Sequence, residues 1–128
     1  MRIASTIARY LLGLVFLVFG LNHYLNFIPM GPMPTGVAGQ FMGAMMQSRY
    51  FWVVAFFEVV PGILLLVNRY VPLALTLLGP VIVNILLVDI LMAPQGLPVG
   101  IAVAVFWVLV FLRVPSAFTG IFQSQVAE

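Results

Sequence analysis

The chain has 128 residues, of which 64% are hydrophobic and only 6% are charged, and its mean hydropathy is +1.23. A soluble domain usually carries about a quarter charged residues, so this composition excludes a soluble globular fold and indicates an integral membrane protein. The net charge of +2 is too small for a nucleic-acid-binding surface. The chain contains no cysteine, which excludes disulfides, thiolate metal sites and covalent haem attachment.

Four apolar segments each have close to the ~17–25 residues that a helix needs to cross the hydrocarbon core of a bilayer. They cover residues 10–27, 51–67, 71–92 and 97–112. Backbone polar groups in a bilayer must be satisfied within the protein, and segments of this length can do so only as helices. The sequence therefore predicts an all-α, single-domain four-helix transmembrane bundle. The fourth segment is short, so we expect it to borrow residues from Pro94 or from beyond Arg113.

The first segment starts as a signal peptide does, because Arg2 and Arg9 precede an apolar run. No small-residue cleavage site follows that run, since the next residues are Asn22, His23 and Tyr24. We therefore expect this segment to remain in the protein as a true span.

The segment between the first two spans begins with prolines and glycines, a composition typical of a turn-rich linker. Val37, Phe41 and Met45 then recur at helical spacing after Thr35, which is a suitable helix cap. This spacing predicts a short helix that lies on the membrane surface or folds back over the bundle. Several methionines of this segment could offer thioethers to copper(I), but flexible apolar filler is the better interpretation, and we predict no metal site.

The arginines are distributed unevenly between the two sides of the predicted bundle. Four of them lie on the side that holds both termini and the link between the second and third spans: Arg2, Arg9, Arg69 and Arg113. Only Arg49 lies on the other side. The positive-inside rule therefore predicts that both termini are cytoplasmic and that residues 28–50 and 93–97 face outward.

A polar or ionisable side chain within a span costs a few kcal/mol even on lenient insertion scales, so it is a candidate functional group. The candidates are Asn22, His23 and Asn26 on the first span, Glu58 on the second, and Asn84 and Asp89 on the third. Helical rise places Glu58 near the midplane, His23 and Asn84 in the outer half, and Asp89 near the outer headgroups. These depths suggest one polar pocket that opens outward.

Helical spacing places residues of each of the first three spans on a common face. The sets are Gly13, Phe16, Gly20 and His23 on the first span, Ala55, Glu58 and Gly62 on the second, and Thr76, Pro80 and Asn84 on the third. Glycines let a neighbouring helix approach closely, so Glu58 is expected to face the bundle interior, where it is neutral or hydrogen-bonded to Asn84 or water. Asp89 lies about 140° away from the Asn84 stripe.

Glu58 and His23 are the candidate catalytic groups, and Asn22, Asn84 and Asp89 are the candidate ligand-binding groups. Each has a simpler alternative. His23 can be an interfacial residue that faces water, Asn84 a hydrogen-bonding contact between helices, and Asp89 a solvated helix end.

Four stretches of the chain together resemble the DoxX-like family of small membrane proteins. They are residues 8–22 (ARYLLGLVFLVFGLN), 58–66 (EVVPGILLL), 69–75 (RYVPLAL) and 79–87 (GPVIVNILL). The chain departs from the closest subgroup at Val88 and Asp89, where that subgroup tends to have an aromatic residue and a histidine. The resemblance implies a four-span bundle in a bacterial or archaeal cytoplasmic membrane. It also implies quinone-coupled thiosulfate oxidation, or membrane complexes that respond to oxidative or sulfur stress.

Three functions are therefore considered. The first is a quinone-linked redox subunit, in which Glu58, His23 and Asn84 bond the quinone carbonyls and deliver protons, while a partner subunit carries the electron-donating cofactor. The second is a non-catalytic accessory subunit that stabilises a larger respiratory or photosynthetic complex. The third is a small oligomeric transporter with Glu58 and Asp89 along its path. The expected partners are the lipid bilayer and either other membrane subunits or further copies of this chain.

Overall fold

The computed structural model describes residues 2–29 and 31–126, in which there is no strand. The helices account for 81% of the described residues, which confirms the all-α class. The elements in chain order are α1 (Arg2–Leu25), α2 (Gly36–Gln47), α3 (Tyr50–Leu66), α4 (Val71–Leu91), the short 3₁₀ helix η1 (Pro94–Gly96), α5 (Leu97–Phe111) and a second 3₁₀ helix, η2 (Pro115–Phe122).

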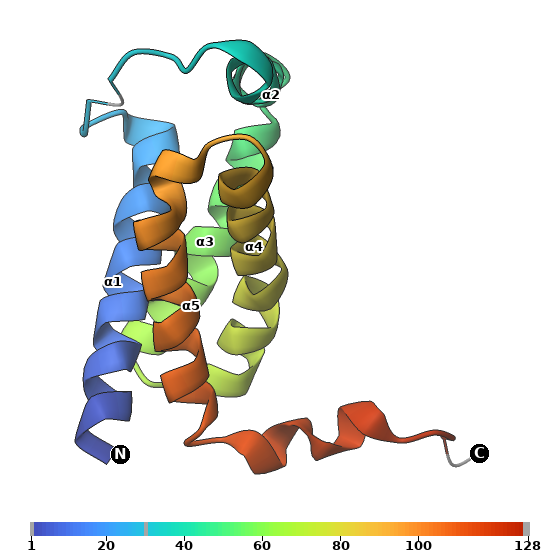
Figure 1. The fold of residues 1–128 in the computed structure, drawn as a ribbon. Helices are drawn as coiled ribbons and strands as arrows, with labels where there is room; N and C mark the ends of the chain where they lie inside the picture. Colours follow the sequence, from blue (N-terminus) through green and yellow to red (C-terminus); the bar gives the residue numbers. More distant parts are fainter. Residues whose placement is uncertain (1, 30, 127–128) are drawn as a thin grey trace.

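Four long helices form a closed bundle in which α1 and α4 each pack against both α3 and α5 (Figure 1). The start of α1, the link between α3 and α4, and the start of η2 lie at one end of the bundle, which we call the base. The opposite end, which we call the top, carries η1 and α2. Helix α2 lies at the top, bent by 84° from α3, which confirms the predicted short helix in this segment.

Three helical stretches are long and apolar enough to cross a membrane: α1, α4, and the 18 residues from Pro94 to Phe111 that combine η1 and α5. The bent α2–α3 pair is the fourth candidate. The helical stretch that starts at Pro94 agrees with the predicted extension of the fourth apolar segment, and the four-span topology stays a prediction. The α3, α4 and α5 boundaries lie within one residue of the predicted ones.

Helix α1 begins at Arg2, eight residues before the apolar segment that predicted it. The additional turns pack because small side chains face the bundle, where Ser5 and Ala8 are buried. The Ser5 hydroxyl donates a 2.8 Å hydrogen bond to the carbonyl of Leu109 on α5. The base of α1 is thus fixed to α5 by a polar contact that hydropathy does not report.

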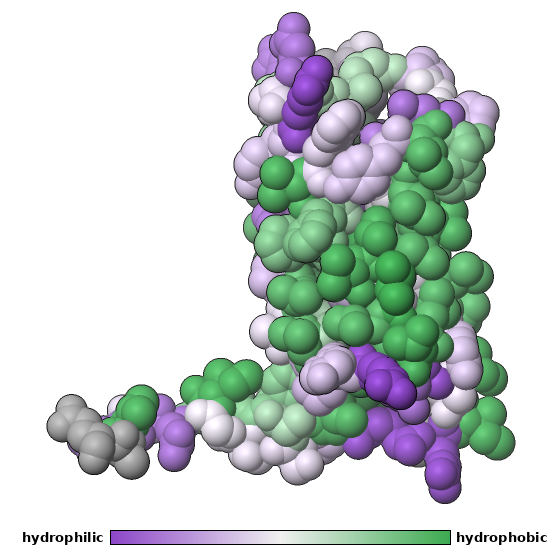
Figure 2. Space-filling view, turned by 180° about the vertical axis from the view of Figure 1, so that it is seen from behind, coloured by the Kyte–Doolittle hydropathy of each residue, from purple (hydrophilic) through white to green (hydrophobic). Residues whose placement is uncertain are grey.

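The interior of the bundle is an apolar layer to which all four long helices contribute. Its members include Leu12, Phe16, Leu65, Leu75, Leu78, Val103 and Val110. The outward faces are also apolar, with Leu14, Val53, Phe56, Val83 and Ile101 exposed. Figure 2 shows a green apolar surface over the middle of the bundle and hydrophilic side chains gathered towards the top and base. Helices that are apolar all round are typical of membrane spans, and the chain is accordingly a multi-pass membrane protein.

Helices α1 and α3 approach each other closely at two glycines. A Cβ added to Gly13 would lie 2.9 Å from the carbonyl oxygen of Gly62, and a Cβ added to Gly62 would lie 2.9 Å from that of Gly13. Real Cβ atoms essentially never approach other atoms this closely, so only glycine permits the packing at either position. The predicted glycine-lined contact faces of these two spans are confirmed.

Candidate functional site

The structure brings together the two predicted catalytic residues at the contact between α1 and α3. The His23 Nε2 atom lies 3.4 Å from Glu58 Oε1, and the two side chains are 21% and 8% exposed. Glu58 is the ninth residue of the 17-residue helix α3, so helical rise places it about 12 Å from either end. The chain therefore holds an acid and an imidazole in contact within its apolar section.

Small residues on both helices make this contact possible. A Cβ at Gly20 would lie 3.1 Å from the Cβ of Glu58 and 3.2 Å from the carbonyl oxygen of Ala55. Gly20 therefore lets α1 approach α3 at the level of the carboxylate. His23 follows three residues later on the same face of α1, and its ring stacks on Phe51 at 4.9 Å between centroids.

The pair is short of hydrogen bonds for a buried acidic group. Glu58 Oε1 is buried and accepts no hydrogen bond from any described residue. A charge-assisted hydrogen bond is normally about 2.7–2.9 Å long, so the 3.4 Å separation from His23 is a contact and not a closed bond. Unsatisfied buried polar atoms are rare in folded proteins and often mark functional groups. Glu58 has the local chemistry expected of a group that binds a proton or a donor from a ligand.

Asn22 is buried beside the pair but has a structural role in the turn that follows α1. Its Oδ1 accepts a 2.8 Å hydrogen bond from the backbone N–H of Ile28, and its Nδ2 donates to the carbonyl of Ile28 at 3.3 Å. The backbone N–H of Asn26 also bonds to the Asn22 carbonyl at 2.9 Å. Asn22 therefore fixes the chain where it leaves α1 near His23, and its ligand-binding role stays a prediction.

Asn84 does not join the pair, so the predicted shared pocket is not formed. Thr76, Pro80 and Asn84 do share one face of α4, as their spacing indicated, but all three are exposed. The Thr76 hydroxyl donates to the carbonyl of Pro72 in its own helix. This face points away from the bundle. Among the described residues, Asn84 and Glu58 share no hydrogen bond, so the expected bond is not formed.

Asp89 is buried at the top of α4 in a place that sequence reasoning missed. A Cβ at Gly96 would lie 2.5 Å from Asp89 Oδ1, and a Cβ at Gly100 would lie 2.5 Å from Oδ2. Two glycines four residues apart, Gly96 at the end of η1 and Gly100 in the first turn of α5, therefore provide the space for the carboxylate. The spacing of these two glycines was the feature of the sequence that could have indicated a buried Asp89. Asp89 is only 8% exposed, so the alternative of a solvated helix end is wrong.

The described residues contain no group of three or more His, Asp or Glu side chains that could hold a metal ion. The arrangement that they do provide is an imidazole against a buried carboxylate, which can take up and release a proton or bond a carbonyl group of a ligand. No family model, curated protein or solved structure matches the chain. The functional argument therefore rests on this site, and the DoxX resemblance stays a prediction.

Proposed function

We propose that this chain is a DoxX-like four-span subunit of a quinone-linked oxidoreductase in a bacterial or archaeal cytoplasmic membrane, with both termini cytoplasmic. The observation that carries the proposal is the contact between His23 and Glu58, whose Oε1 is buried without a hydrogen-bond donor among the described residues. An ionisable side chain within a span is energetically unfavourable, and a functional role is a common reason why such a group is retained.

Quinone reduction requires protons together with electrons, and the carbonyl oxygens are the atoms that receive the protons. His23 can donate a hydrogen bond to one carbonyl, and Glu58 can resupply the imidazole with a proton. Phe51 stacks on His23, and Trp52 packs edge-on against Tyr24. These aromatic side chains next to the pair suit the apolar ring of a quinone. The electrons would come from a partner subunit that carries the redox cofactor.

A second candidate function is that of an accessory subunit, and the exposed face of α4 favours it. Asn84 lies about 10 Å below the top end of α4 by helical rise, yet its side chain is exposed. An amide that faces lipid has no hydrogen-bond partner, and a neighbouring helix would supply one at a gain of about 0.6–2 kcal/mol. This placement supports contact with another membrane helix on that face.

One experiment with two reciprocal variants separates the two functions. Glu58→Gln keeps the shape of the side chain and removes its proton, whereas Asn84→Leu removes the polar group from the α4 face. The protein and its associated subunits are purified in mild detergent, and bound quinone, subunit composition and quinone reductase activity of the membranes are measured.

The redox proposal expects Glu58→Gln to retain the subunit composition and to lose bound quinone or reductase activity. The accessory proposal expects Asn84→Leu to release the chain from its complex while Glu58→Gln behaves as the parent. If no quinone copurifies with the parent protein and Glu58→Gln leaves the quinone reductase activity of the membranes unchanged, the redox proposal is wrong.

A further inference from the structure

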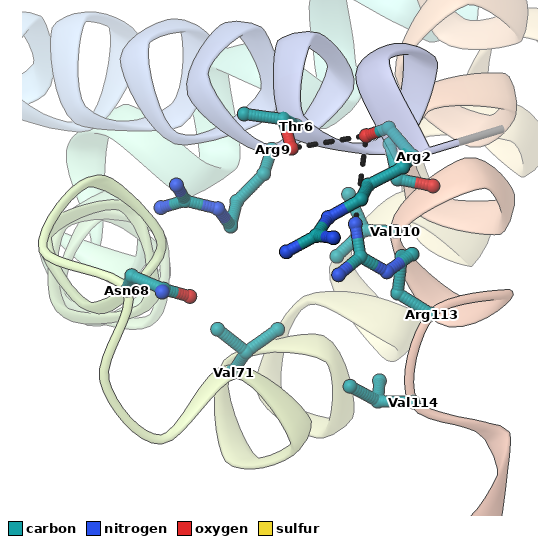
Figure 3. A pocket seen from close by; sticks show the side chains of 9 residues that line it. Arg2, Thr6, Arg9, Asn68, Val71, Val110, Arg113 and Val114 are labelled. Atoms are coloured by element: carbon teal, nitrogen blue, oxygen red, sulfur yellow. Dashed lines mark hydrogen bonds between the residues drawn. The ribbon is translucent and has the colours of Figure 1, made fainter.

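The base of the bundle contains a cavity of about 300 Å³ between α1, the link after α3 and the end of α5 (Figure 3). Three arginines line it: Arg2 and Arg9 from α1, and Arg113 from the residues after α5. Asn68 contributes an amide, and the valines at the start of α4 and the end of α5 form an apolar wall. The cavity is separate from His23 and Glu58, because those residues lie in the upper part of α1 and the middle of α3.

The three positive charges have no acidic counterpart in the described part of the base. The described residues contain two carboxylate side chains, Glu58 in the middle of α3 and Asp89 at the top of α4. Glu128 lies outside the described residues. Guanidinium groups that share a cavity repel one another, although water screens part of this repulsion because Arg2 and Arg113 are exposed and Arg9 is half-buried. An anion bound between them would relieve it.

Two of the guanidinium groups contact backbone carbonyls. Arg9 donates to the carbonyl of Leu65 and lies over the ring of Tyr10 at 4.3 Å. Arg113 donates to the carbonyl of Arg2 at 3.5 Å, and Figure 3 shows its side chain beside that of Arg2. A guanidinium has five N–H donors, and these contacts use one from each residue. Most of the donors are therefore left for a ligand.

The cavity lies at the base, beyond the apolar middle of the bundle, where hydrophilic side chains gather (Figure 2). The 3₁₀ helix η2 leaves the base sideways, across the direction of the bundle (Figure 1). Ile121 and Phe122 at its end are 65% and 85% exposed, and apolar side chains on a helix of this orientation are typical of an interfacial segment. If the bundle spans a bilayer with η2 at its surface, the arginines of the cavity lie at the level of the lipid phosphates.

We propose that this base cavity is an oxyanion-binding site in which Arg2, Arg9 and Arg113 bind a phosphate group. Arginine forks match phosphate oxygens bidentately. The group can belong to the headgroup of an anionic phospholipid, whose glycerol would lie against the valine wall, or to free phosphate from the aqueous side. The proposal goes beyond the redox function and does not depend on it.

The test compares two double variants that remove the same charge. Arg9→Gln with Arg113→Gln changes the cavity, whereas Arg49→Gln with Arg69→Gln removes two arginines that do not line it. Each protein is purified in a neutral detergent, and retained phosphatidylglycerol and phosphatidylcholine are measured by native mass spectrometry. Thermal stability is then measured with inorganic phosphate and with chloride at equal ionic strength.

A lipid site predicts that the parent and the Arg49/Arg69 variant retain phosphatidylglycerol over phosphatidylcholine. The Arg9/Arg113 variant should bind it at least roughly tenfold more weakly, because each arginine near a lipid phosphate contributes about 1 kcal/mol. A free-anion site predicts instead that inorganic phosphate raises the Tm of the parent and of the Arg49/Arg69 variant but not that of the Arg9/Arg113 variant. Arg9→Lys with Arg113→Lys keeps the charge and the fold but not the bidentate geometry, and should give an intermediate affinity.

Two results would overturn the proposal. One is equal loss of phosphatidylglycerol from both glutamine variants, which would indicate a general charge effect. The other is a parent protein that neither prefers phosphatidylglycerol nor is stabilised by inorganic phosphate.

Discussion

Gly62→Ala is the substitution that most directly tests the packing that places His23 against Glu58. The added Cβ would lie 2.9 Å from the carbonyl oxygen of Gly13 and 2.9 Å from the backbone nitrogen of Leu17. An ordinary contact of this kind starts at 3.4 Å. Both obstacles are backbone atoms, so no side-chain rotation can relieve the overlap and the two helices must separate. Overpacking of this kind typically costs about 1–3 kcal/mol.

Two glycines elsewhere in the bundle provide matched controls for the same substitution. Gly79→Ala adds a Cβ with nothing within 4 Å, so we expect no loss of stability and a gain of up to about 1 kcal/mol from helix propensity. Gly100→Ala meets the carboxylate tip of Asp89, which can rotate, and should fall between the other two.

Unfolding in mixed micelles of SDS and mild detergent, followed by circular dichroism, gives the three free energies. A Gly62→Ala variant as stable as Gly79→Ala would refute the close approach of α1 and α3.

Two further predictions address the topology and the α4–α5 contact. Single cysteines at Gly36 and Gln125, in a chain that has no native cysteine, report sidedness to an impermeant thiol reagent on whole cells. The positive-inside rule predicts labelling at Gly36 only. Labelling at Gln125 only would show that the topology is the reverse of the predicted one. Trp107→Phe keeps an aromatic ring but removes the 2.9 Å hydrogen bond from Nε1 to the carbonyl of Leu75. It should reduce the free energy of unfolding by about 0.5–1.5 kcal/mol, and a change within error would show that the bond contributes nothing.

The sequence predicted the helices well because their length is set by the thickness of the bilayer. The α3, α4 and α5 boundaries follow the apolar segments within one residue, and the α1–α3 contact follows the glycines at 13 and 62. The start of α1 was missed because a turn that carries arginines can still be helical where small residues such as Ser5 face a neighbour.

The error in the predicted pocket has a different physical cause. Helical spacing correctly placed Thr76, Pro80 and Asn84 on one face, but apolar residues occur on every side of α4, so the hydropathy pattern does not indicate which face is buried. On α1 and α3, by contrast, glycines mark the contact face. The location of Asp89 depends on Gly96 and Gly100 in the following elements, so it becomes visible only when the packing of α5 on α4 is known.

The polar groups of the bundle are separated along its axis, and this separation bears on the transporter hypothesis. His23 and Glu58 lie in the middle and upper part, whereas the arginine-lined cavity is at the base. Leu12 and Leu65, both fully buried, belong to the apolar layer between them. A path for an ion or polar solute through one copy would have to displace this layer at about 1.5–3 kcal/mol for each exposed leucine. The packing of the described residues therefore closes the centre of one copy, so the oligomeric transporter would need its path between copies of the chain.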